Sequence, residues 1–173
     1  MRFLILAFSC LPVLSMAQTD PSDYLYRVCD EEEENCGYVN QEGDTVIPLK
    51  YYPCFTDTLK EFAIVNDYEV KGGFPAIDRH DNVLFVVYPF DNGPDYVEEG
   101  LFRIIDNDLI GFANMQGEIV IKPQFQCAFM FIDGKAQVAF IGRKESVPES
   151  EHWSWISNEW FFIDHDGNRV EGN

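Results

Sequence analysis

The chain has 173 residues, of which 46% are hydrophobic and 15% aromatic, and its 30 acidic and 12 basic residues give a net charge of −18 at pH 7. This length is enough for one domain with a hydrophobic core, and the aromatic and aliphatic content excludes a disordered chain. The excess of negative charge repels phosphate groups, so we expect no nucleic-acid partner and no binding to an anionic membrane surface.

Residues 1–17 are predicted to be a secretory signal peptide. A short basic start at Arg2 precedes an apolar run over residues 3–14, and small residues lead to a cleavage site near Ala17. The run is too short for a membrane-spanning helix, which needs about 20 residues. The residues before Cys10 do not fit a lipoprotein signal. We therefore expect an exported protein (periplasmic, cell-surface or secreted) that is not a lipoprotein or an integral membrane protein.

Residues 18–35 are predicted to form an N-terminal lead-in and an acidic loop. Polar residues come first, and residues 24–28 then alternate between apolar and polar side chains, which favours a short strand. Glu31 to Glu34 follow as four consecutive carboxylates. Consecutive carboxylates on a loop rarely converge on one ion, so this segment is interpreted as solvated loop.

Four cysteines remain after cleavage, and an even number in an exported chain favours disulfides. Three pairings are possible, and four buried free thiols are the alternative. A Cys29–Cys36 bond would close the acidic loop and is the candidate pairing. The cysteines are Cys29, Cys36, Cys54 and Cys127.

One short phrase occurs four times between residues 36 and 173. The copies read GYVNQEGD from Gly37, PAIDRHDN from Pro75, GFANMQGE from Gly111 and FFIDHDGN from Phe161. Repetition on this scale indicates structural units that bury their apolar faces against their neighbours. We expect a repeat domain over 36–173, with units at about 36–71, 72–108, 109–142 and 152–173.

Each unit is predicted to be a β-hairpin with a further strand. An aromatic-rich strand ends at Asn or Asp, a turn follows, and a β-branched strand returns at 45–47, 83–87, 118–121 and 169–170. Asn, Asp and Gly tolerate the positive φ of hairpin turns. The structural repeat positions are Gly37, Asn40, Gly43, Asp78, Gly111, Asn114, Gly117, Asp164 and Gly167.

Two further features complete the predicted fold. Pro48, Pro89 and Pro123 are each expected to break the returning strand, and closing strands are expected at 60–65, 99–104 and 133–138. The polar insertion 143–150 is expected to be an exposed loop. No segment has a sustained helical period. The fold class is therefore all-β, with three tandem hairpin repeats and a partial fourth stacked as a solenoid-like or curved antiparallel sheet.

The repeated pattern resembles the bacterial WG-repeat family. The third copy is the best match, with Ile110-Gly111-Phe112-Ala113-Asn114, Ile121-Lys122-Pro123-Gln124-Phe125 and Phe131-Ile132-Asp133-Gly134-Lys135-Ala136-Gln137-Val138. The opening Trp of the family motif survives only at Trp160. The resemblance implies repeated β-hairpins without a shared catalytic residue, and binding or scaffolding roles.

The sequence contains no recognised catalytic motif, phosphate-binding loop or metal-ligand spacing. His80 and His165 occupy turn positions of the repeat, where polar side chains are expected without a metal. Carboxylate pairs are uninformative in so acidic a chain. We predict no catalytic residues, no metal and no cofactor.

The candidate recognition residues are Trp153, Trp155 and Trp160, the three tryptophans of the chain. An exposed indole combines a large apolar face with one N–H donor, which suits a sugar or an apolar peptide group. The alternative is that Trp153 and Trp155, two apart on one strand face, cap the open end of the last repeat. The sequence leaves both interpretations open.

The function predicted from the sequence is a non-enzymatic binding or structural module at the bacterial envelope, with a protein or glycan partner. Two alternatives stay open. The first is a glycan- or peptidoglycan-associated hydrolase that uses carboxylates, and the second is a proteinaceous inhibitor or immunity protein.

Overall fold

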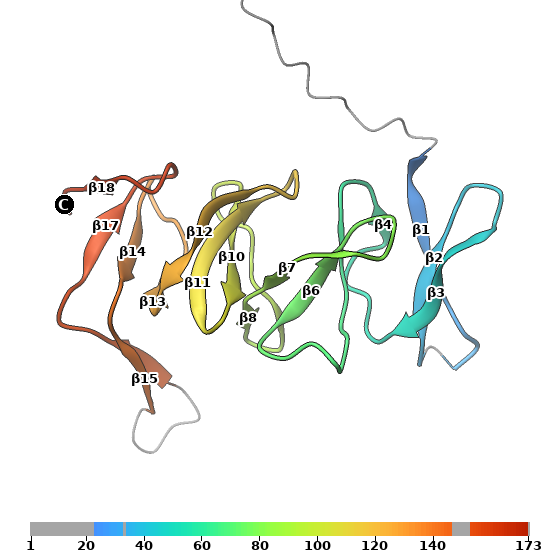
Figure 1. The fold of residues 1–173 in the computed structure, drawn as a ribbon, viewed down its shortest axis with the longest axis horizontal. Helices are drawn as coiled ribbons and strands as arrows, with labels where there is room; N and C mark the ends of the chain where they lie inside the picture. The colour runs from blue at the N-terminus through green and yellow to red at the C-terminus, as the bar shows by residue number, and fades with distance from the viewer. Residues whose placement is uncertain (1–22, 33, 147–152, 173) are drawn as a thin grey trace, which may run out of the picture.

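The computed structural model describes residues 23–32, 34–146 and 153–172. The predicted signal peptide and its cleavage site near Ala17 lie outside the described residues. Within them the protein is built from antiparallel β-strands, no α-helix occurs, and no sheet closes into a barrel. The predicted all-β hairpin architecture is therefore confirmed. Its sheets follow one another along the long axis of the molecule (Figure 1).

The strands are short, as expected for a chain with frequent turn residues. In chain order they are β1 (Leu25–Cys29), β2 (Cys36–Val39), β3 (Thr45–Tyr51), β4 (Thr58–Leu59), β5 (Ala63–Ile64), β6 (Phe74–Ile77), β7 (Val83–Val87), β8 (Pro89–Phe90), β9 (Gly93–Pro94), β10 (Leu101–Asp106), β11 (Leu109–Asn114), β12 (Ile119–Phe125), β13 (Cys127–Ala128), β14 (Ala136–Ala139), β15 (Arg143–Ser146), β16 (Trp153–Ile156), β17 (Phe161–Ile163) and β18 (Arg169–Val170).

Three sheets carry most of these strands. Their orders are β3-β2-β1-β4, β12-β11-β10-β7-β6-β5 and β13-β14-β17-β18. Two small hairpins, β8–β9 and β15–β16, are separate from them. The β15–β16 hairpin extends below the row of sheets in Figure 1. The hydrophobic core is divided in the same way, into three clusters of buried side chains distributed along the chain.

A disulfide between Cys29 and Cys36 joins β1 to β2 at the acidic loop. The two cysteines are register partners at the end of the antiparallel pair, so the bond closes the acidic loop and is the pairing named above as the candidate. Cys54 and Cys127 are buried free thiols. Burial raises the pKa of both thiols, which keeps them protonated at neutral pH.

Two predictions about irregular segments were wrong. Pro48 and Pro123 do not end their strands, because β3 and β12 continue through them to an aromatic residue. Both strands lie at a sheet edge and pair with irregular register, so the missing N–H of proline costs no ladder hydrogen bond. Residues 143–146 are also not loop, since they form β15 against β16.

The glycines at the first repeat position permit close backbone approach. A Cβ atom on Gly37 would lie 2.4 Å from the carbonyl oxygen of Ile47, and one on Gly111 would lie 2.4 Å from that of Ile121. No side chain fits at such a distance. In the second unit the corresponding residue is Pro75, and the close approach occurs instead at Gly73, whose Cβ would meet the Val87 carbonyl oxygen at 2.1 Å.

Candidate functional site

The predicted turn positions share one hydrogen-bond pattern in all four units. The side-chain oxygen of Asn or Asp accepts the backbone N–H four residues later, at 2.8 Å from Asp44, 2.9 Å from Asn82, 2.9 Å from Glu118 and 2.8 Å from Asn168. The acceptors are Asn40, Asp78, Asn114 and Asp164. These side chains close the turn locally, as Asx turns do. The shared positions therefore serve the architecture of the turns.

Gly43, Gly117 and Gly167 occupy the last turn position with φ of 88°, 81° and 82°. The second unit has Asp81 there, at φ 66°. Asp81 accepts a hydrogen bond from the Tyr51 hydroxyl at 2.6 Å and pairs with Lys50 at 2.6 Å. These contacts join the first unit to the second and offset the strain of a non-glycine residue at positive φ.

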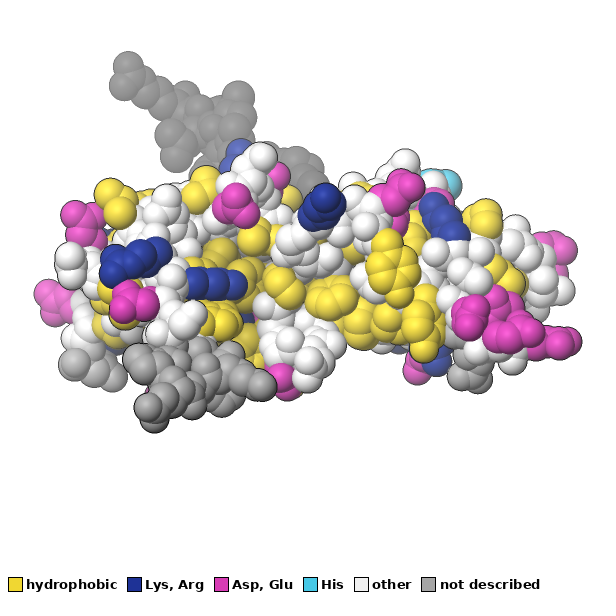
Figure 2. All heavy atoms as spheres, turned by 90° about the horizontal axis from the view of Figure 1, so that it is seen from below, with side chains coloured by type: hydrophobic (Ala, Val, Ile, Leu, Met, Phe, Trp, Pro, Cys, Tyr) yellow, Lys and Arg dark blue, Asp and Glu magenta, His cyan; other side chains and the backbone are white. Residues whose placement is uncertain are grey.

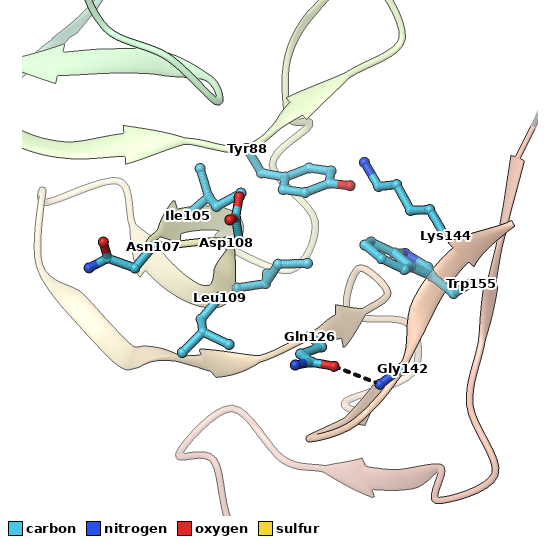
Figure 3. Close-up of a pocket in the computed structure, with 10 residues that line it drawn as sticks. Tyr88, Ile105, Asn107, Asp108, Leu109, Gln126, Gly142, Lys144 and Trp155 are labelled. Carbon is cyan, nitrogen blue, oxygen red and sulfur yellow. Dashed lines mark hydrogen bonds between the residues drawn. The ribbon is translucent and has the colours of Figure 1, made fainter.

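A pocket of about 400 Å³ lies between the β10–β11 hairpin and the β15–β16 hairpin (Figure 3). Its lining residues come from five separate parts of the chain. They are Tyr88, Ile105, Asn107, Asp108, Leu109, Ile110, Gln126, Gly142, Lys144 and Trp155. This is the candidate functional site, because pockets with an apolar wall and a few converging polar groups are typical of ligand sites.

The wall of the pocket is the end of the β10–β11 hairpin. Ile105 pairs with Ile110, and a two-residue turn of Asn107 and Asp108 connects the strands. Both turn residues have positive φ, at 50° and 63°, which matches the right-handed twist of the hairpin. The turn thus presents an amide and a carboxylate at one end of an otherwise apolar wall, which Leu109 completes.

The opposite end of the pocket contains Lys144 among aromatic rings. Its ammonium nitrogen lies 4.1 Å from the ring centroid of Trp153, 5.1 Å from that of Trp155 and 5.2 Å from that of Tyr88. The indoles of Trp153 and Trp155 meet edge to face at 4.9 Å. Cation–π attraction therefore holds the ammonium at the pocket. Burial and the nearby Arg103 charge lower the pKa of Lys144.

Tyr88 is the buried polar group of the pocket. The residue is 1% exposed, and its hydroxyl is buried without a hydrogen-bond partner among the described residues. Figure 3 shows this hydroxyl directed toward the side of the pocket where Lys144 lies. Burial raises the pKa of Tyr88 to about 12, so the phenol is neutral and able to donate. An unsatisfied buried hydroxyl costs free energy, so this one distinguishes Tyr88 from the other buried polar groups of the described residues.

A buried ion pair between Arg103 and Asp95 packs against the Tyr88 ring. The Arg103 side chain donates from Nε to Asp95 at 2.9 Å and from Nη1 to the Ala128 carbonyl at 3.0 Å. Its guanidinium lies 4.6 Å from the Tyr88 ring centroid. The Arg103 and Asp95 side chains are 3% and 0% exposed, so the pair is desolvated but fully hydrogen-bonded. The ring of Tyr88 is therefore held on a rigid support.

Gln126 and Gly142 position the β15–β16 hairpin beside the pocket. The Gln126 side-chain oxygen accepts the Gly142 N–H at 2.9 Å, which directs the amide nitrogen away from Gly142 (Figure 3). A Cβ atom on Gly142 would lie 2.2 Å from the sulfur of Cys127 and 2.9 Å from the Ile156 carbonyl oxygen. Only glycine allows the chain to leave the third sheet at this point.

The structure places Trp153 and Trp155 in contact and Trp160 apart from them. Trp155 lines the pocket and packs against the core cluster beneath it. Trp153 is 40% exposed and contacts Lys144 outside the pocket wall. Trp160 lies elsewhere, with its ring 5.4 Å from Phe129. Sequence reasoning missed Tyr88 and Lys144, because neither belongs to a repeat motif and the tertiary fold alone brings them together.

Histidine and carboxylate groups form no metal site in the described part of the chain, where no group of three or more His, Cys, Asp or Glu could hold an ion. His165 stacks on Phe131 at 4.6 Å, and its Nε2 lies 2.8 Å from a Glu99 carboxylate oxygen. The backbone N–H of Gly134 also donates to Glu99 at 3.0 Å. Glu99 therefore links separate parts of the third and fourth units.

The comparisons with known proteins agree with the repeat geometry. A family model described as WG containing repeat matches residues 37–56 and 110–140. The chain carries WG repeats. The matches fall on the first and third units, whose Gly37 and Gly111 are retained. Comparisons with curated proteins and with solved structures returned no match. Over the described residues, the WG-repeat protein has no helix of sufficient length and hydrophobicity to span a membrane.

Proposed function

We propose that this WG-repeat protein is a non-enzymatic binding module that acts after export, and that the pocket beside Tyr88, Lys144 and Trp155 is its ligand site. The observation that carries the proposal is that Tyr88, whose buried hydroxyl has no partner among the described residues, lines the same pocket as Lys144 and Trp155. The repeats build the frame, and the β15–β16 hairpin completes the pocket.

The composition of the pocket favours binding over the hydrolase alternative. Among the described residues, its lining contains one carboxylate, that of Asp108. Glycoside hydrolysis usually needs a pair of carboxyl groups on either side of the scissile bond. Asp108 also shows the exposure of a solvated turn residue. These features support a site that holds a ligand without transforming it.

The envelope location rests on the predicted signal peptide together with the Cys29–Cys36 disulfide. Disulfides persist in oxidising compartments, so the bond is compatible with export. Expression of the full chain, followed by intact-mass analysis of the exported fraction, tests this part. We expect a mature chain that begins at Gln18 with two thiols oxidised, whereas an uncleaved and fully reduced chain would contradict export.

Fluorine NMR of protein labelled with fluorotryptophan tests the binding site. The chain has three tryptophans, so single Trp→Phe variants assign each resonance. Addition of neutral and charged saccharides and short peptides should shift the Trp153 and Trp155 resonances and leave that of Trp160 in place. A ligand that shifts Trp160 alone would place the site elsewhere. Loss of the added compound by cleavage would favour the hydrolase.

A further inference from the structure

We propose that the ligand of this pocket is a sugar acid, with its carboxylate held by Lys144 and Tyr88 and its hydroxyl groups held at the Asn107–Asp108 turn. This inference rests on the proposed binding function and specifies the ligand class for the same site.

The first argument is that Lys144 is a cation without an acidic partner in the described residues. Its contacts are the rings of Tyr88, Trp153 and Trp155. The neighbouring carboxylate, Glu145, is paired with Arg143 at 2.8 Å. Aromatic faces attract an ammonium group but do not accept its N–H bonds as an oxygen does. Lys144 therefore retains donors for an anion, in a chain where acids outnumber bases by 30 to 12.

The second argument is that two further donors line the same pocket. The neutral Tyr88 hydroxyl has no partner in the part of the chain that the structure describes, and the Gln126 amide nitrogen lies on the side away from Gly142 (Figure 3). A carboxylate has two oxygens with about four lone-pair sites, so it can accept from several donors at once. A single neutral hydroxyl could not satisfy this set. These donors of the pocket lining therefore favour an oxyanion.

The third argument concerns the opposite end, which favours hydroxyl groups. Asn107 and Asp108 provide acceptor oxygens, and Ile105 and Leu109 form an apolar surface between the two ends. A pyranose ring has this distribution, with hydroxyls at its rim and C–H groups on its face. A second carboxylate on the ligand would meet Asp108 and be repelled. The site is thus suited to one anionic group beside a hydroxylated ring.

The surrounding surface is consistent with a ligand of low charge. Figure 2 shows hydrophobic side chains along the middle of the underside, with Lys and Arg groups among them and acidic groups mainly toward its margins. The net charge of −18 would still repel an extended polyanion. Burial and Arg103 lower the pKa of Lys144, and a bound carboxylate would oppose that effect by stabilising the charged ammonium.

Matched pairs of sugars test the proposal with the fluorotryptophan protein and with calorimetry. N-Acetylmuramic acid is compared with N-acetylglucosamine, and galacturonic acid with galactose, because each pair differs by a carboxylate-bearing group. We expect the acid of at least one pair to bind roughly tenfold more tightly than its neutral partner and to shift Trp155. Equal binding of acid and neutral sugar at Trp155 would overturn the sugar-acid inference and leave the binding function standing.

Variants separate ligand contact from structural roles. Lys144→Met retains a long apolar chain against the rings and should abolish the preference for the acid, whereas Lys144→Arg should preserve it. Tyr88→Phe should weaken acid binding severalfold without lowering thermal stability, because it removes a hydroxyl that has no partner. Acid preference that survives Lys144→Met in a folded variant would overturn the proposal.

A further set of measurements with peptides tests whether the bound carboxylate comes from a peptide C-terminus and not from a sugar acid. A tripeptide with a free C-terminus is compared with the same peptide amidated. Binding of the free peptide at Trp155, with no binding of either sugar acid, would overturn the sugar assignment. Failure of every compound to shift Trp153 or Trp155 would overturn the inference and, together with a negative outcome of the wider saccharide and peptide screen, the proposed function.

Discussion

Asp78 and Asn82 close the turn between β6 and β7 through their side chains. The Asn82 backbone N–H donates to Asp78 Oδ1 at 2.9 Å, and the Asn82 side-chain amide donates to Asp78 Oδ2 at 3.0 Å. The first and third units reverse the partners, since Asn40 faces Asp44 and Asn114 faces Glu118. Each turn thus pairs one amide with one carboxylate, whichever comes first.

Asn82→Asp should therefore destabilise the protein, because it places two carboxylates in one turn. We expect a loss of roughly 0.5–1 kcal/mol at neutral pH, as for other exposed polar pairs. Adding Asp78→Asn to the same chain should restore most of the lost stability, because the turn then has its amide first and its carboxylate second, as in the first and third units. Urea unfolding of the two single variants and the double variant gives the coupling, and additive losses would contradict the pairing rule.

Gly111→Ala should destabilise the protein by about 2 kcal/mol or more, because its Cβ would meet the backbone oxygen of Ile121 at 2.4 Å. Gly134→Ala is the matched control. Gly134 has positive φ of 77° but open space around its Cβ position, so only the conformational cost of about 1 kcal/mol is expected there. Similar losses in both variants, measured by thermal unfolding, would contradict the close approach at Gly111.

Asp164 should contribute to stability in a pH-dependent way. The Asn168 backbone N–H and side chain hydrogen-bond to its carboxylate and hold its pKa below the ordinary value. Because the folded pKa is lower than the unfolded one, the stabilisation is fully present above the unfolded pKa and is lost as pH falls through the folded pKa. Asp164→Asn should therefore be less stable than the wild type at pH 6, and the difference should shrink toward pH 2. The free energy of unfolding is measured with urea at these pH values. A difference between the two proteins that stays constant with pH would contradict the prediction.

Asp95→Asn should cost about 3 kcal/mol or more, because it leaves the buried Arg103 guanidinium without a counter-charge. Adding Arg103→Met should recover part of the loss by removing the unpaired charge. The Trp155 fluorine resonance should also move in Asp95→Asn, since Arg103 supports Tyr88 at the pocket. Denaturant unfolding measures the first effect. An Asp95→Asn loss below about 1 kcal/mol would show that this ion pair does not hold the pocket.

The repeat frame could be predicted because its determinants are local. Asn40, Asp78, Asn114 and Asp164 bond to groups four residues away, so their role can be read from a short segment of sequence. The Cys29–Cys36 bond could also be proposed, because β1 and β2 are joined by a short loop. The prediction that Pro48 breaks its strand was wrong, because a proline is accepted within an edge strand of irregular register, and no local sequence rule identifies such a strand.

The pocket could not be predicted, because its parts are distant in sequence. Tyr88 follows β7, Gln126 precedes β13, and Lys144 lies in a segment that looked like exposed loop. Pairing of β15 with β16 sets Lys144 opposite Trp155, and Trp155 packs against the buried cluster that contains Tyr88. Nothing in the repeat pattern marks these residues as a group.

The sequence by itself determined that this is a β-hairpin repeat protein, because turn residues and alternating apolar residues act over a few positions. Only the tertiary structure decided that Lys144 lies among Tyr88, Trp153 and Trp155, and that the Tyr88 hydroxyl is buried without a partner among the described residues. Burial and the absence of a hydrogen-bond partner are properties of the packed molecule, so they depend on contacts between segments far apart in the chain.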